Sequence, residues 1–217
     1  DVRTHGDDIA VIVWTSGTTG KPKGWCLTNR AAVMRGIKLT TALNVSRTTR
    51  RAQVLSPSFA AWFTGTMPAL LTNSSICFMR TWDPEEYLRM IEERELTLTT
   101  LVPTMWREIL SLDSFDDFDL SSLERITAAG ERLDTTTLER LQEDICERVY
   151  NAYAATEIMA TSMSDKEMDE DLVESVGKPA IGTQVRIVEE GGSPDDALPT
   201  GEVGEILVKG PDCASWA

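Results

Sequence analysis

Apolar runs with the length of β-strands alternate with helix-forming segments through the middle of this sequence, and this alternation restricts the fold more than any other feature. The predicted strands are Ser75–Met79, Leu96–Val102, Arg125–Ala129 and Val149–Ala152. Each is separated from the next by a segment that favours a helix. Because a strand, a helix and a second parallel strand form a βαβ unit, the pattern predicts an α/β fold: a parallel sheet with helices on both faces.

The clearest helix start is Asp83-Pro84-Glu85-Glu86. Aspartate is a good N-cap, proline suits the first turn, and acidic side chains favour the positive end of the helix dipole. We expect this helix to end near Arg94, with Leu88 and Ile91 facing inward. Further helices are expected over residues 29–42, from Pro103, and after Asp134, where Leu138, Leu141, Ile145 and Val149 have helical spacing.

A glycine-rich loop follows another apolar run, Ile9–Val13, whose length and β-branching predict a buried strand. The loop, Trp14–Gly24, reads Trp-Thr-Ser-Gly-Thr-Thr-Gly-Lys-Pro-Lys-Gly. Its glycines let the backbone approach a ligand closely, while hydroxyl, N–H and ammonium groups all bind phosphate oxygens. We interpret the loop as a polyphosphate-binding site.

Other readings of this loop fit less well. The P-loop pattern requires a glycine five residues after the first, but Pro22 follows Gly17 at that distance and Trp25 follows Gly20. A Rossmann glycine pattern is also absent. The remaining alternative is an ordinary surface turn, which the ordered run of glycines, hydroxyls and two lysines disfavours.

Composition excludes several classes of function. The formal net charge of −14 disfavours a nucleic-acid partner, which requires a basic face. The sequence has no apolar stretch long enough to span a membrane. Its four cysteines form no Cys-x-x-Cys pair, which favours reduced thiols and a cytoplasmic location. The acidic, lysine-poor composition suggests the further hypothesis of a high-salt habitat.

Chemically rich segments follow two predicted strands at their carboxyl ends, where ligands bind in parallel α/β sheets. One is the turn from Gly130 to Leu133, in which Gly130 permits a close backbone approach. The other, Asn151–Glu157, offers an aromatic face for a purine, an amide, a hydroxyl and a carboxylate for a hard cation. By itself this second segment is more often an ordinary strand-to-helix junction, but the upstream loop favours a nucleotide site.

The pattern changes after residue 164. Residues 165–174 are strongly acidic and predict an exposed connector. Gln184–Val188 and Glu202–Lys209 alternate in the manner of strands, with a turn-rich segment between them. We therefore expect an α/β core over residues 1–164, followed by a connector and the start of a β-rich subdomain over residues 165–217. The first residue is Asp1, not methionine, which suggests that both parts are incomplete pieces of a longer protein.

The ordered motifs resemble those of the adenylate-forming superfamily, most closely its acyl-CoA synthetases. The loop is similar to the family's signature loop, and Asn151–Glu157 is similar to its Tyr-Gly-x-Thr-Glu motif. Gly130–Leu133 resembles its adenine-contacting turn. Two later segments, Val176–Pro179 and Gly201–Ile206, also resemble family segments, so that the likeness covers essentially the whole chain.

This resemblance implies ATP, Mg²⁺ and coenzyme A as ligands, and it assigns roles to individual positions. The phosphates of ATP would be held by Thr15, Ser16, Gly17, Thr18, Thr19, Gly20 and Lys23. Tyr153 would stack on adenine, whose edge would meet Asn151, Ala152 and the backbone of Gly130, Glu131 and Arg132. Thr156 would bind the α-phosphate, Glu157 would bind Mg²⁺ together with Thr15, and the catalytic groups would be Thr156, Glu157 and Lys23.

Three departures from the family pattern stand out. Ala60 occupies a position where members often carry a histidine or an aromatic residue, and Ala154 replaces the glycine of the Tyr-Gly-x-Thr-Glu motif. The family's later ribose-binding aspartate and its small C-terminal domain with a catalytic lysine do not occur in residues 1–217. We therefore expect this polypeptide alone to be nearly inactive in adenylation.

The expected reaction is ATP-dependent activation of a carboxylic acid, followed by thioester formation with coenzyme A. Such chemistry needs no general base, which agrees with the single histidine, His5, lying outside every motif. Apolar residues at Phe59–Phe63, with Met105 and Trp106, suggest an apolar acyl group, but core packing explains them at least equally well. A fatty acid is the first choice, an aryl acid the second and an amino acid for a peptide synthetase the third. A non-catalytic nucleotide-binding module and a simple ATPase remain alternatives.

Overall fold

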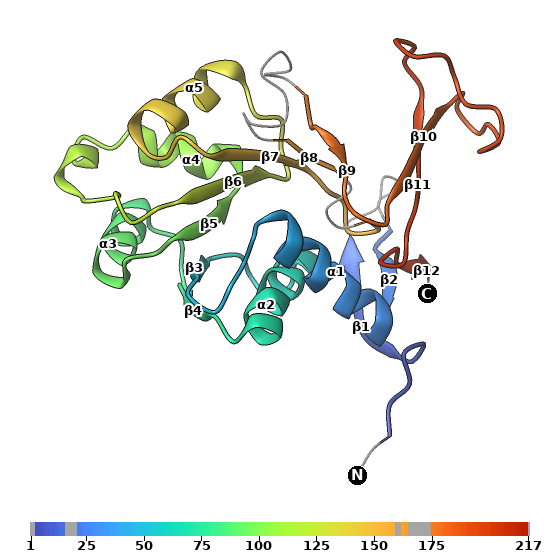
Figure 1. The fold of residues 1–217 in the computed structure, drawn as a ribbon, viewed down its shortest axis with the longest axis horizontal. Helices are drawn as coiled ribbons and strands as arrows, with labels where there is room; N and C mark the ends of the chain where they lie inside the picture. Colours follow the sequence, from blue (N-terminus) through green and yellow to red (C-terminus); the bar gives the residue numbers. More distant parts are fainter. Residues whose placement is uncertain (1–2, 16–20, 159–161, 165–174, 217) are drawn as a thin grey trace.

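The computed structural model describes residues 3–15, 21–158, 162–164 and 175–216 (Figure 1). Within these residues the largest sheet has seven strands in the order β4-β3-β5-β6-β7-β8-β9. Its parallel part consists of β3 (Arg50–Gln53), β4 (Ser75–Phe78), β5 (Leu98–Leu101), β6 (Arg125–Ala129) and β7 (Val149–Tyr153). Two short antiparallel strands, β8 (Ser162–Ser164) and β9 (Lys178–Pro179), extend it at one edge. The predicted α/β class is confirmed.

Helices cover both faces of this sheet. The helices are α1 (Asn29–Ala42), α2 (Ala60–Thr72), α3 (Pro84–Arg94), α4 (Pro103–Leu110) and α5 (Thr135–Asp144), with a 3₁₀ turn at Phe115–Asp117. Figure 1 shows α1 and α2 on one side of the sheet and α4 and α5 on the other. No helix in the described part of the chain is both long and apolar enough to cross a membrane.

Alternating side chains of the strands supply two separate cores, because successive residues of a strand point to opposite faces. Ile126, Ala128 and Val149 join the larger core with α3, α4 and α5. Tyr150 and Ala152 face the other way, toward the C-terminal end of α1. The strands are therefore buried on both sides, as expected of a parallel sheet.

The predicted helix starts at Asp83 and Asp134 are confirmed by their caps. The Asp83 carboxylate accepts a hydrogen bond from the Glu86 N–H (2.8 Å), and Leu88 and Ile91 are fully buried. Asp134 caps α5 in the same way, accepting from the Thr137 N–H (2.9 Å). The prediction that Val149 continues the apolar face of this helix is wrong. The helix ends at Asp144, where the Leu141 carbonyl accepts from the N–H groups of both Ile145 and Cys146.

The expected burial of residues 9–13 is wrong, although the strand itself is present. β1 (Ile9–Thr15) pairs antiparallel with β2 (Lys23–Thr28), and β2 pairs with β12 (Ser215–Trp216) in a small three-stranded sheet. This sheet packs by one face only: Val13 is buried, whereas Ile12 is 45% and Trp14 65% exposed. β-Branched composition predicted a strand correctly but could not indicate how many of its faces are covered.

A two-stranded antiparallel sheet, β10 (Gln184–Val188) with β11 (Glu205–Lys209), confirms the predicted strands of the C-terminal region. The predicted acidic connector, residues 165–174, lies outside the described residues. The division of the chain at residues 164 and 165 therefore stays a prediction.

Candidate nucleotide site at the carboxyl ends of the strands

Two of the predicted site segments leave the sheet at the same edge. β6 and β7 are parallel, with Ala128 paired to Asn151 and Ala129 to Ala152. The next residues, Gly130 and Tyr153, are therefore level with each other and follow the same face of the sheet. The structure thus brings together the turn after β6 and the segment after β7, as their positions at strand ends predicted.

Gly130 has a backbone conformation that favours glycine, with φ = +90°. A Cβ atom added to it would meet only the Val102 Cγ1, at 3.5 Å. Packing therefore does not require glycine here; the turn conformation does, since side chains rarely adopt this φ. The residue is exposed, and its backbone is accessible from outside the protein.

Glu131 holds the turn against the start of α4. Its carboxylate accepts hydrogen bonds from the Thr104 N–H (3.2 Å) and hydroxyl (2.7 Å). Arg107 lies within ion-pair distance of the same oxygen (3.7 Å). The Glu131 side chain thus positions the turn after β6. Arg132, the next residue, is exposed.

The three residues at the end of β7 face different surroundings. Asn151 is buried and its Nδ2 donates to the Ser175 carbonyl (3.1 Å), while Tyr153, on the same face, is half-buried. Ala152 points to the opposite face and packs in the core beside Tyr150 and Met163. Only the backbone of Ala152 is therefore placed to contact a ligand near Tyr153.

The Thr156–Glu157 segment is fixed to α1 by a buried arginine. Arg35 Nη2 donates to the carbonyls of Thr156 (2.9 Å) and Glu157 (3.2 Å), and its Nε donates to the Asp212 carbonyl (3.0 Å). Burial lowers the pKa of Arg35 to about 10, while the charges of Asp212, Cys213 and Glu157 act in the opposite direction. The side chains of Thr156 and Glu157 are half-buried.

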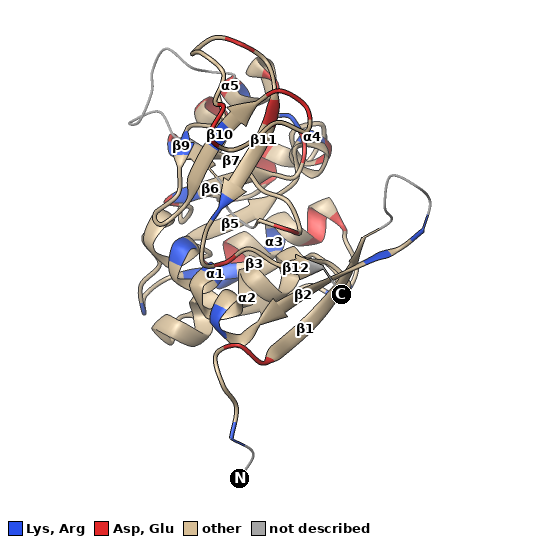
Figure 2. Ribbon diagram, turned by 90° about the vertical axis from the view of Figure 1, so that its right-hand side faces the viewer, with Lys and Arg blue, Asp and Glu red and all other residues tan. Residues whose placement is uncertain are grey.

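The same segment is connected to the β1–β2 hairpin. The Glu157 carbonyl also accepts from the Ala214 N–H (2.8 Å), and the next residue, Ser215, pairs with Cys26 of β2. β2 begins at the half-buried Lys23, which pairs with Thr15. Figure 1 shows the three strands of this small sheet near the end of β7, and Figure 2 shows basic residues at the start of β2 and along α1. Ser16, Gly17, Thr18, Thr19 and Gly20 lie outside the described residues.

Sequence reasoning missed Arg35, Lys38 and Asp212. Lys38 Nζ donates to the Asp212 carboxylate (2.5 Å) and to the Thr183 hydroxyl (2.5 Å), and the ion pair is almost completely buried. The sequence trace of Arg35 and Lys38 is a pair of basic residues on the α1 face that otherwise carries Ala31, Ala32 and Gly36, and this pattern does not distinguish solvated from buried cations. Asp212 lies outside α1 and leaves no such trace.

The carboxylate of Glu157 fits the binding of a divalent cation. Among the ion pairs of the described residues none involves Glu157, and those residues contain no cluster of three or more His, Cys, Asp or Glu side chains suited to a metal. Mg²⁺ in phosphate-binding sites is commonly held by one or two carboxylates together with substrate phosphates. A single carboxylate agrees with this mode, in which the phosphates of a substrate supply further ligands.

The two residues that depart from the family pattern lie at different places: Ala60 at the start of α2 and Ala154 directly after β7. Ala60 is buried at the first helical position, while Phe59 before it is 61% exposed. Trp62 is half-buried, and its ring lies 6.1 Å from that of Phe78. Ala154, directly after β7, is also half-buried.

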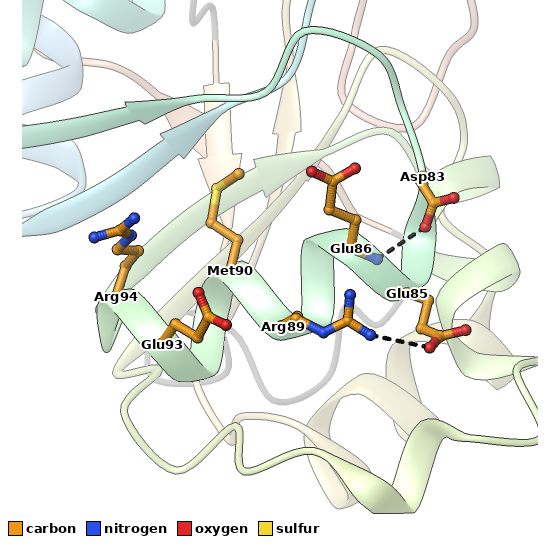
Figure 3. A pocket seen from close by; sticks show the side chains of 7 residues that line it. All are labelled: Asp83, Glu85, Glu86, Arg89, Met90, Glu93 and Arg94. Carbon is orange, nitrogen blue, oxygen red and sulfur yellow. Dashed lines mark hydrogen bonds and ion pairs between the residues drawn. The ribbon is translucent and has the colours of Figure 1, made fainter.

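A surface pocket elsewhere on the molecule has no part in this site. It is lined by residues of α3 and its cap, namely Asp83, Glu85, Glu86, Arg89, Met90, Glu93 and Arg94 (Figure 3). Two of its polar contacts stabilise the helix itself: the Asp83 cap and the pair of Arg89 with Glu85 (3.2 Å). The pocket is a depression along one helix, and we assign it no function.

Comparison with known families agrees with this geometry. The family model described as AMP-binding enzyme matches residues 1–215. A feruloyl-CoA synthase from Amycolatopsis is 30% identical over 209 residues, covering 95% of this chain and 42% of the relative. The medium/long-chain-fatty-acid–CoA ligase FadD8 of Mycobacterium tuberculosis is 31% identical, covering 94% of this chain and 36% of the relative. The chain thus spans about two fifths of the length of these relatives.

Other similar proteins extend the comparison. Tyrocidine synthase 2 of Brevibacillus parabrevis is 29% identical over 94% of this chain and 6% of its own length. The solved structure of O-succinylbenzoate coenzyme A synthetase from Bacillus subtilis, in complex with ATP and magnesium ion, superposes with a TM-score of 0.87 at 22% identity. It is matched over all of this chain and 45% of its own. At that identity the superposition shows a shared fold.

Proposed function

The chain belongs to the AMP-binding enzyme family, and from this premise we propose that its full-length protein activates a carboxylic acid with ATP and passes the acyl group to coenzyme A. The main observation in support is that the Thr156–Glu157 segment, which follows β7, is hydrogen-bonded both to Arg35 of α1 and to Ala214, next to the strand that pairs with β2. Residues far apart in sequence thereby lie around one edge of the sheet. The family and the acyl-CoA ligases among its relatives support an acid–thiol ligase.

We assign the ATP-binding roles as follows. Tyr153 stacks on adenine, and the backbone of Gly130–Arg132 together with Asn151 and Ala152 lines its edge. One of the two N–H groups of the Asn151 side-chain amide donates to the Ser175 carbonyl, which orients the amide, and we assign its oxygen to accept from the adenine amino group. The phosphates are held by the loop, through Thr15, Ser16, Gly17, Thr18, Thr19, Gly20 and Lys23.

The proposed reaction is an in-line displacement at the α-phosphorus. A carboxylate oxygen of the substrate forms a bond to phosphorus, the bond to the bridging oxygen breaks, and pyrophosphate leaves with the bonding electrons. The substrate is already ionised, so the protein contributes position and charge stabilisation rather than a base. Thr156 donates to the α-phosphate and Lys23 balances the charge of the leaving group. His5, exposed before β1, takes no part.

Glu157, with Thr15, is the proposed ligand set for Mg²⁺. When bound there, the cation neutralises phosphate charge. The backbone carbonyl of Glu157 accepts hydrogen bonds from Arg35 and from the Ala214 N–H. These two bonds fix the backbone that carries the Glu157 carboxylate.

A fatty acid is our first choice of substrate, and an aryl acid is the second. The similarity to a fatty-acid–CoA ligase supports the first, and the similarity to a feruloyl-CoA synthase supports the second. The apolar side chains at the start of α2, Phe59 and Trp62, suit either. An amino acid is the third choice, supported by the similarity to tyrocidine synthase 2.

We further propose a cytoplasmic location and an organisation into an α/β core over residues 1–164 and a β-rich region over residues 165–217. All four cysteines are free, which supports a reducing compartment. The separate two-stranded sheet of β10 and β11 supports the second region.

Acid-dependent exchange of pyrophosphate into ATP tests the proposal. The full-length protein is assayed with a panel of fatty, aryl and amino acids, and Glu157→Gln is assayed beside it. We expect exchange with at least one acid, and a loss of about 10²-fold or more in the variant, the size typical of removing one group that stabilises charge in the transition state.

Two results would contradict the proposal. ATP binding without exchange for any acid would indicate a nucleotide-binding module without catalysis. Release of phosphate in the absence of acid, with no AMP formed, would indicate an ATPase.

A further inference from the structure

Arg35 connects segments that are far apart in the sequence. Its side chain is fully buried on α1, and its hydrogen bonds reach carbonyls 121, 122 and 177 residues away. Two of these carbonyls belong to Thr156 and Glu157, and the third belongs to Asp212. Only the planar, forked guanidinium of arginine donates in several fixed directions at once, whereas a lysine ammonium acts as a single point charge.

The charges around Arg35 are not balanced by a single partner. Arg35 and Lys38 are two buried cations, and in the described part of the chain the one buried carboxylate hydrogen-bonded to either is Asp212, which binds Lys38. The Glu157 carboxylate lies close enough to favour the charged form of Arg35. One nitrogen of Arg35, Nη1, is buried without a hydrogen-bond partner. An apolar side chain in such a position often gives equal or greater stability, so stability alone does not explain the arginine.

We propose that Arg35 is a positioning residue for Thr156 and Glu157. α1 begins directly after β2, which starts at Lys23 on the phosphate side, and it carries Arg35 to the carbonyls of the Thr-Glu pair. The arginine thereby fixes the position of Thr156 and Glu157, the groups assigned to the α-phosphate and the cation, relative to α1 and to Lys23 at the start of β2. The inference rests on the proposed function, because it assigns Arg35 a role in that reaction.

Arg125 provides a matched control. It is another buried arginine whose guanidinium donates to two carbonyls, those of Leu43 (3.0 Å) and Asn44 (2.9 Å). Arg125 is the first residue of β6, and Gly130 follows the opposite end of that strand. Its replacement removes comparable hydrogen bonds without touching the Thr156–Glu157 segment.

The test compares Arg35→Met, Arg35→Lys and Arg125→Met in the full-length protein. For each variant we measure the melting temperature, the rate of acid-dependent pyrophosphate exchange, and the Mg²⁺ concentration that gives half-maximal exchange. Arg35→Met removes one of the two buried cations and leaves the Lys38–Asp212 ion pair, whose net charge is zero. The removal of the unbalanced charge favours folding of this variant. Arg35→Lys keeps the positive charge but loses the planar guanidinium that donates to several carbonyls at once.

Both Arg35 variants are expected to lose about 10-fold or more in exchange rate and to need several-fold more Mg²⁺, because a small displacement of positioning groups has effects of this size. Arg125→Met is expected to melt lower, with wild-type Mg²⁺ dependence per folded molecule. A wild-type rate and Mg²⁺ requirement in a folded Arg35 variant would overturn the inference, as would an equal change of Mg²⁺ requirement in Arg125→Met.

Failure of the proposed function is distinguishable from failure of this inference. If the wild-type protein exchanges no pyrophosphate, the proposed function fails. The affinity of wild type and variants for Mg²⁺ with ATP, measured by calorimetry, then decides the positioning role. Weaker binding in both Arg35 variants but not in Arg125→Met supports it, and equal binding in all of them contradicts it.

Discussion

At the scale of single residues, Asp134 illustrates how one side chain defines a helix start next to the candidate site. Its two oxygens accept from the N–H (2.9 Å) and hydroxyl (2.7 Å) of Thr137. These hydrogen bonds, followed by the charge of Arg107, hold the pKa of Asp134 below its usual value. An ionised carboxylate is therefore stabilised in the folded protein more than in the unfolded chain.

We expect Asp134→Ala to lower the free energy of unfolding by about 1 kcal/mol at pH 7, as for other N-caps. Since the folded pKa is depressed, this contribution is present above the unfolded pKa of about 3.9 and is lost as the pH falls through the folded value. Urea unfolding of variant and wild type at a series of pH values measures the difference. Asp134→Asn, which caps without titrating, is the control; a difference between Asp134→Ala and wild type that is independent of pH would contradict the explanation.

The site residues that sequence predicted are those within local motifs. Gly130 directly follows β6, Tyr153 is the last residue of β7, and Thr156 and Glu157 lie in the segment after it; strand ends are recognisable from apolar runs. Arg35 and Asp212 were not predictable, because neither lies in a motif and their roles arise from contacts 121 to 177 residues apart. The sequence of a 14-residue helix does not indicate whether an arginine in it is solvated or buried.

At the scale of elements, those with a clear local signal were predictable: apolar runs for strands, and an N-cap or an N-terminal proline for helices. α3 and α5 begin with aspartates that bind the first turn. α2 has no side-chain cap and contains Gly65 and Pro68, so local signals argue against a helix that tertiary packing nevertheless stabilises. β3 reads Arg-Arg-Ala-Gln and carries no apolar pattern, yet it lies between β4 and β5.

The close contact of α1 with α2 leads to a prediction at this scale. A Cβ atom on Gly36 would lie 2.7 Å from Met67 Cβ and 2.8 Å from Leu71 Cδ1. Alanine improves helix propensity by about 1 kcal/mol, but overpacking costs about 1–3 kcal/mol, and Met67 Cβ cannot move without its backbone. We expect Gly36→Ala to lower the free energy of unfolding by about 1 kcal/mol.

Denaturant unfolding of Gly36→Ala checks this expectation. Thr41→Ala, at an exposed position of the same helix, is the matched control and is expected to change stability little. A Gly36→Ala variant more stable than wild type would show that helix propensity outweighs the contact between the two helices.

At the scale of the whole molecule, charge sets the response to salt. The chain carries 35 acidic and 21 basic side chains. Their mutual repulsion is screened as the Debye length shortens from about 30 Å at 0.01 M salt to about 8 Å at 0.15 M. We expect the melting temperature to rise by several degrees with added NaCl, mostly below about 0.2 M, as repulsion is removed.

Calorimetric scans over a NaCl series test this expectation and the hypothesis of a high-salt habitat. Screening saturates at low concentration, whereas exclusion of salt from the surface continues to act at molar concentration, so the shape of the curve separates the two effects. A melting temperature that stays flat or falls from low to molar salt would count against both the screening and the habitat.

The sequence by itself determined the α/β class, the capped helices, the strand ends that carry Gly130 and Tyr153–Glu157, and the family resemblance of their motifs. These are local properties: apolar periodicity, capping and turn chemistry act over a few residues. Only the tertiary structure decided that β1 is exposed on one face, that β3 lies inside the sheet, and that Arg35 links α1 to Thr156 and Glu157. Burial and long-range hydrogen bonds depend on which segments meet in space, and a linear sequence does not state this.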